Sequence, residues 1–125
     1  MKFMLMMNCG RDGYDEYLSW PKPVLQANIE FMRAFGRKLS AAGELVAAEG
    51  LASPKQARQV RAGRDGKPVT DGVFPESKEF LAGYWIVAVP NRQRAYEIAA
   101  EASTAPGIGA QPLQIEVREV MSGPP

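Results

Sequence analysis

The sequence contains no histidine and a single cysteine, Cys9. The absence of histidine excludes Ser-His-Asp and Cys-His catalysis, an imidazole general base and histidine-ligated zinc. A lone cysteine cannot close a disulfide within the chain, which fits a reducing compartment. No set of Cys, Asp or Glu has the spacing of metal ligands, so we predict neither a metal nor a cofactor.

A strong net charge and a long apolar run are missing as well. The chain carries 15 basic and 14 acidic side chains, and the basic residues are scattered, which argues against nucleic-acid binding. No stretch approaches the roughly 20 apolar residues that cross a bilayer, and the apolar run at the start of the chain is too short for a signal peptide. We therefore expect a cytoplasmic protein without a nucleic-acid or membrane partner.

The 125 residues fit one domain, because a second hydrophobic core would leave too little apolar surface for the first. Hydrophobic residues make up 46% of the chain, which is ordinary for a globular protein. We place a single domain at residues 1–121 and expect residues 122–125 to form a flexible tail.

Hydrophobic periodicity predicts four strands, two helices and one hairpin. The strands are predicted at residues 2–8, from 45 to before Ser53-Pro54, at 80–89 and at 113–117. One helix is predicted from an N-cap at Ser19 to about Ala42, ending at Gly43, and the other over residues 92–103. Residues 10–16 read as a loop, and Asp65-Gly66 predicts the turn of an exposed hairpin.

This order of elements is that of an α+β ferredoxin-like sandwich with a hairpin insert. Two helices cover only one face of the sheet. The strands at 2–8 and 80–89 are nevertheless apolar on both faces, and a large open apolar face is unusual on a monomer. We therefore predict a homodimer in which two sheets pack face to face.

The segment from Thr70 to Trp85, TDGVFPESKEFLAGYW, resembles the DGPF-type branch of the YCII-related family, whose pattern reads approximately DGPFAETKE followed by a Gly-aromatic strand. The resemblance extends to the Met-rich first strand, residues 42–51 and the closing strand at 115–120. The sequence departs from the pattern at Val73 and Pro75. The resemblance implies a dimeric α+β barrel and little chemistry. Some relatives resemble enzymes that use a histidine and an aspartate, and this chain has no histidine for that role.

The same segment supplies the candidate ligand-binding residues. They are three carboxylates, one ammonium group and a hydroxyl: Asp71, Glu76, Glu79, Lys78 and Tyr84. Such groups bind a polar ligand or transfer protons where burial shifts their pKa values. The alternative is structural, with Asp71 capping a turn, Gly72 permitting an unusual backbone dihedral and the other charges paired at a loop or at the dimer interface.

Three aromatic residues, Tyr14, Tyr17 and Trp20, either rim a pocket or pack at a helix entrance. We predict a dimer that binds a small polar or anionic molecule near Asp71–Glu79. Two alternatives stay open: a cofactor-free acid/base enzyme with Glu79 or Asp71 as base and Lys78 polarising the substrate, or a regulatory protein-interaction module. The sequence assigns no catalytic residue and leaves open whether the protein is an enzyme.

Overall fold

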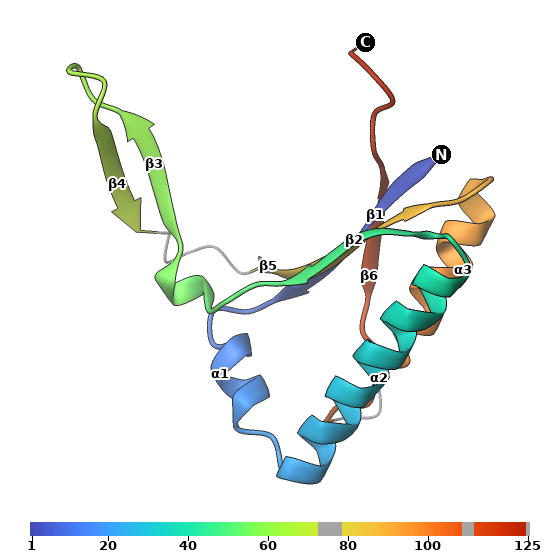
Figure 1. Ribbon diagram of the computed structural model, residues 1–125. Helices are drawn as coiled ribbons and strands as arrows, with labels where there is room; N and C mark the ends of the chain where they lie inside the picture. Colours follow the sequence, from blue (N-terminus) through green and yellow to red (C-terminus); the bar gives the residue numbers. More distant parts are fainter. Residues whose placement is uncertain (73–78, 109–111, 125) are drawn as a thin grey trace.

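The computed structural model describes residues 1–72, 79–108 and 112–124 (Figure 1). Its strands are β1 Lys2–Cys9, β2 Leu45–Gly50, β3 Arg58–Ala62, β4 Pro68–Gly72, β5 Phe80–Ala88 and β6 Ile115–Glu119. Its helices are α1 Gly13–Leu18, α2 Lys22–Ala41, α3 Arg92–Ala102 and the 3-10 turn η1 Pro54–Gln56. Within these described residues, none of the helices has the length and hydrophobicity of a membrane span.

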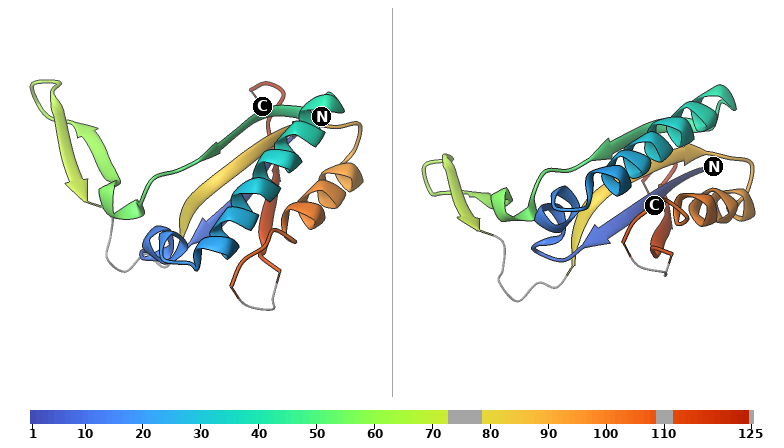
Figure 2. Two further views of the ribbon diagram at one scale, coloured as in Figure 1. Left: turned by 60° about the horizontal axis from the view of Figure 1, so that its bottom comes forward. Right: turned by 90° about the horizontal axis from the view of Figure 1, so that it is seen from below.

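Four strands form one antiparallel sheet in the order β2-β5-β1-β6, and β3 and β4 form a separate hairpin. Helices α2 and α3 lie on the same face of the four-stranded sheet (Figure 2). The chain is therefore a mixed α+β protein with an antiparallel sheet, as predicted. The chain order of strand, helix, strand, hairpin, strand, helix and strand also agrees with the prediction.

The hydrophobic core lies between the sheet and its two helices. Alternate residues of β1 and β5 point into it, because successive side chains of a strand face opposite sides. The core residues are Phe3, Leu5, Trp85, Val87 and Val89 from the sheet region, Phe35 and Leu39 from α2, and Ala95, Ile98, Ala99 and Ala102 from α3. Three of the four buried positions of α3 are alanines, and these small side chains let the helix lie close to the sheet.

The first helical region differs from the prediction in two places. Ser19 is not the N-cap of α2: it is the C-cap of α1, and its hydroxyl donates to the Glu16 carbonyl at 2.7 Å. The prediction overlooked that Pro21 disfavours helical backbone at the residue before it, so α2 begins only at Lys22. Residues 10–16 are also not all loop, because α1 begins at Gly13 and carries acidic residues in its first turn, where the helix dipole favours them.

Gly43 ends α2 as predicted. Its φ of 73° lies in the left-handed region, and the amides of Gly43 and Glu44 donate to the carbonyls of Ser40 and Leu39 at 3.0 and 2.9 Å. This paired arrangement satisfies two carbonyls of the last helical turn and reverses the chain into β2. Glu44 then accepts two hydrogen bonds from Arg94, at 2.7 and 2.8 Å, which fasten the start of β2 to α3.

Strand β6 begins two residues later than predicted, at Ile115 rather than Leu113. The amide of Leu113 donates to the Ser103 carbonyl at 3.2 Å, so this residue is held at the end of α3 and not in the sheet. The alternation of the strand itself holds, since Ile115 and Val117 are half-buried against the core while Glu116 and Arg118 are exposed.

Candidate functional site

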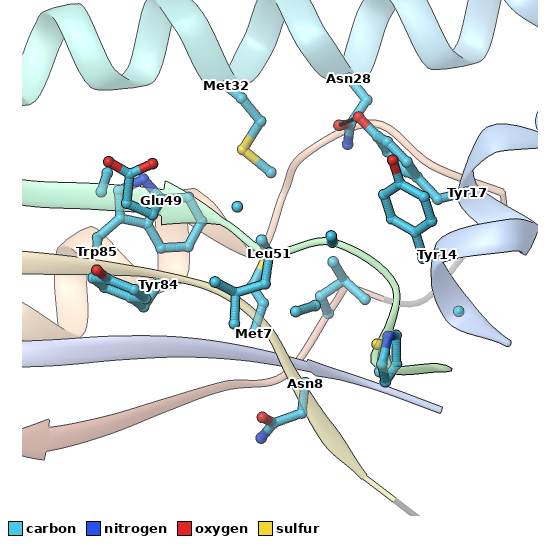
Figure 3. Close-up of a pocket in the computed structure, with 18 of the residues that line it drawn as sticks. Met7, Asn8, Tyr14, Tyr17, Asn28, Met32, Glu49, Leu51, Tyr84 and Trp85 are labelled. Carbon is cyan, nitrogen blue, oxygen red and sulfur yellow. Dashed lines mark hydrogen bonds between the residues drawn. The ribbon is translucent and has the colours of Figure 1, made fainter. Parts of the chain in front are cut away.

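A pocket with a volume of about 710 Å³ opens between α1, α2 and the sheet (Figure 3). That volume lies within the range of small-molecule sites, roughly 300–1,000 Å³. Its lining is mostly apolar and aromatic, and comes from β1, α1, α2, β2, the η1 segment and β5. The lining residues are Met7, Asn8, Cys9, Gly13, Tyr14, Tyr17, Trp20, Asn28, Met32, Gly36, Ala48, Glu49, Gly50, Leu51, Ala52, Pro54, Ala82, Tyr84, Trp85 and Leu113.

One stripe of α2 forms a wall of the pocket. Asn28, Met32 and Gly36 are spaced four residues apart, which places them on one face of the helix. Figure 3 shows Met32 pointing from α2 into the space between the helix and the sheet. A Cβ added to Gly36 would meet no atom within 4 Å, so the glycine leaves one part of this wall without a side chain.

Aromatic side chains close the end of the pocket beside α1. The rings of Tyr17 and Trp20 meet edge to face, with their centroids 5.1 Å apart. Trp20 also lies close against Gly107, where an added Cβ would come within 3.1 Å of the indole ring. Tyr17 and Trp20 therefore pack at the helix entrance and also line the pocket, two roles that the sequence left as alternatives.

Asn28 is the principal polar group inside the pocket, with a side chain that is only 5% exposed. Its Nδ2 donates to the Pro106 carbonyl at 2.8 Å, and its Oδ1 accepts from the Tyr17 hydroxyl at 3.1 Å. A primary amide has two N–H groups and two lone pairs, so these bonds use half of its capacity. Asn28 therefore joins α1, α2 and the segment after α3, and it retains one donor and one acceptor position.

Burial sets the chemistry of two further lining groups. It raises the pKa of the Tyr17 hydroxyl, with a smaller contribution from Tyr14, so Tyr17 is a hydrogen-bond donor at neutral pH. Burial, and secondarily the charge of Glu16, also raises the pKa of the Cys9 thiol. Because the thiolate is the nucleophile, Cys9 is not an activated group in this pocket.

An ion cluster spans the outer edge of the pocket. Lys55, next to the buried lining residue Pro54, binds Asp12 at 2.9 Å and Asp15 at 2.7 Å, and so connects η1 to α1. The hydrogen bond from Lys55 lowers the pKa of Asp12. All three side chains are exposed, so water and salt screen the pairs and they add little stability.

The candidate ligand-binding residues that the structure describes, Asp71, Glu79 and Tyr84, lie in three different places. Tyr84 is half-buried on β5 and is among the lining residues, although strand alternation puts it and its direct cross-strand neighbour Glu49 on the opposite face of the sheet from Trp85. Glu79 is exposed and contributes to a second hollow of about 540 Å³, together with Asn8, Gln114 and Glu116. Asp71 is exposed on β4 and belongs to neither lining.

Glu76 and Lys78 lie outside the described residues. In the described part of the chain, no group of three or more His, Cys, Asp or Glu could hold a metal ion. Sequence reasoning also missed Asn28 and Glu49. The available signal for Asn28 was a polar residue on the apolar stripe of α2, four residues before Met32.

A family model described as the YCII-related domain matches residues 1–121. The chain belongs to the YCII-related family. In this YCII-related protein the match covers every element that lines the pocket, from β1 to Leu113. No curated protein matches the chain.

Proposed function

We propose that this protein binds a small organic molecule in the pocket between α1, α2 and the sheet. The observation that carries the proposal is the pocket itself, which is already formed, has the volume of a ligand site and combines an apolar lining with few polar groups. That combination favours a ligand that is more apolar than the polar or anionic molecule expected from the sequence.

The lining suggests how such a ligand is held. Flat apolar parts pack against Trp20, Met32 and Trp85, since aromatic and thioether side chains offer large polarisable surfaces. A carbonyl or hydroxyl group of the ligand bonds to the remaining amide positions of Asn28.

The charged stretch at residues 71–79 remains part of the proposal. Asp71, Glu76, Lys78 and Glu79 precede β5, the strand that carries Tyr84 to the pocket. In this arrangement they would contact a polar end of the ligand that extends beyond the pocket.

A second candidate function is cofactor-free proton transfer on a ligand that reaches the sheet face left uncovered by the helices. The supporting observation is that a carboxylate and a phenol, Glu49 and Tyr84, are direct cross-strand neighbours on the sheet face opposite to the buried Trp85. A base and a hydrogen-bond donor at adjacent positions are the minimum for abstracting a proton next to a carbonyl. Turnover of a bound compound that is lost in Glu49→Gln would distinguish catalysis from binding.

We also propose that two copies pack face to face through the side of the sheet that the helices leave uncovered, as two ferredoxin-like halves of an α+β barrel. Strand register puts Tyr84 opposite Met6 and Ile86 opposite Met4, so the centre of that face is apolar. These side chains are half-buried in the single chain. An apolar sheet face of this kind favours a second copy as its cover.

The pocket is tested with a thermal-shift screen of small apolar and aromatic metabolites on the wild type, Gly36→Leu and Gly36→Ala. A ligand at 100 times its dissociation constant adds about 2.7 kcal/mol of stability, which moves Tm by about 10 °C in a domain of this size. Gly36→Leu places a bulky side chain in the pocket and should abolish the shift. Gly36→Ala adds one methyl group and should preserve it.

The two variants also separate filling of the pocket from damage to the helix, because both remove the same glycine. A shift of equal size in the wild type and in Gly36→Leu would place the ligand elsewhere. Absence of any stabilising compound in a broad library would count against the binding function.

A further inference from the structure

The β3–β4 hairpin stands apart from the rest of the molecule. Its strands pair with each other through five residues each, and they have little contact with the other elements of the described chain. In Figure 1 the hairpin rises beyond one end of the sheet, on the side away from α2 and α3. An isolated two-stranded hairpin is at best marginally stable in water, so this arm gains stability by packing against something else.

Strand register divides the hairpin into two different faces. Val60 pairs with Thr70 and Ala62 with Pro68, so one face is uncharged near the turn. The opposite face carries Gln59, Arg61, Val69 and Asp71. Arg58 belongs by register to the uncharged face, but its guanidinium donates back to the carbonyls of Lys55 and Ala57, at 3.2 and 2.8 Å.

Among the described residues, none of the other helices or strands covers the uncharged face. Val60 is 62% exposed, although valine is typical of the buried face of a sheet. A solvated arm would be expected to carry polar residues on both faces. The pattern of one apolar and one charged face is that of a ribbon with one side packed.

We propose that the hairpin is a clasp that packs its uncharged face, Val60, Ala62, Pro68 and Thr70, against a second copy of this chain. The inference rests on the proposed face-to-face dimer. The arm rises on the side of the sheet that the second copy would cover, so the clasp continues the same interface. In a two-fold symmetric dimer, the hairpin of each copy would pack against the other copy, so the same contact occurs twice.

Sedimentation velocity over a concentration series tests the clasp with two neighbouring substitutions. Val60→Asp puts a charge on the uncharged face and should raise the dimer dissociation constant by about tenfold or more. Gln59→Lys puts a charge on the other face, opposite Asp71 and compatible with it, and should leave the constant unchanged. Both positions are exposed, so circular dichroism should show both variants folded.

The outcomes separate the clasp from the dimer and from the pocket. If neither variant changes the dimer dissociation constant of the wild type, the clasp is overturned while the sheet-face dimer stands. If both variants raise the dissociation constant equally, the assignment of the two hairpin faces is overturned. A dimer that resists both hairpin variants but dissociates in Met6→Asp would assign the interface to the sheet alone. A monomeric wild type would overturn clasp and dimer together, whereas the thermal-shift screen reports on the pocket independently.

Discussion

Replacing Asn28 by alanine should destabilise the protein by about 2 to 3 kcal/mol. The substitution leaves the Pro106 carbonyl without its 2.8 Å donor and the Tyr17 hydroxyl without its 3.1 Å acceptor. An unsatisfied buried polar group costs roughly 1–3 kcal/mol. Tyr17 and Pro106 are both half-buried, so water recovers part of each loss and the two losses together amount to about 2 to 3 kcal/mol. Urea denaturation followed by tryptophan fluorescence measures the change in the free energy of unfolding.

Tyr17→Phe is the matched control, because it removes one of the two hydrogen bonds and leaves the Asn28–Pro106 bond intact. It should cost about 0.5–1.5 kcal/mol, the net worth of one hydrogen bond. The double variant should show a coupling energy of at least about 0.5 kcal/mol, as residues in one network do. A loss below about 0.5 kcal/mol for Asn28→Ala, or strict additivity with Tyr17→Phe, would refute the view that Asn28 ties α1, α2 and the segment after α3 together.

Three further outcomes are expected. Gly43→Ala should lower the free energy of unfolding by about 1 kcal/mol in urea denaturation, because alanine resists the left-handed backbone there, and an unchanged midpoint would contradict this. Arg94 lowers the folded-state pKa of Glu44. The stability from this pair is therefore fully present above the unfolded pKa of Glu44 and is lost as pH falls through the lowered folded-state pKa. Arg94→Met should reduce this loss of unfolding free energy at acid pH, measured by denaturation curves at several pH values. The raised pKa of Cys9 should make alkylation by iodoacetamide at pH 7 slower than for free cysteine, and a rate equal to or above it would be inconsistent with burial of the thiol.

The sequence was most informative where one local rule decides the structure. Periodicity located β1, β5 and α3, and Gly43 and Gly66 marked a helix end and a turn because both adopt positive φ. It failed at Ser19, where two helices follow each other and this polar residue, two positions before a proline, caps the end of the first helix rather than the start of the second.

The pocket was harder to predict, because it depends on tertiary placement. Asn28, Gly36 and Trp85 come from elements far apart in the chain, and nothing local indicates that a glycine in a helix faces a cavity. The polar stretch at Asp71–Glu79 attracted attention because charged residues were concentrated there. The structure instead builds the pocket from apolar surface, to which Tyr84 contributes from this stretch, while Tyr14, Tyr17 and Trp20, for which the sequence left pocket lining open, contribute as well.

The hairpin has one more consequence, which concerns how proteins of this design can change. It is inserted between β2 and β5, strands that are neighbours in the sheet and pair from Gly50–Gly83 onward. An insertion at this junction can lengthen, shorten or be exchanged without altering any strand register or any helix that bounds the pocket. Natural variation or protein engineering at residues 60–70 of the hairpin could therefore retune self-association while ligand recognition is inherited unchanged.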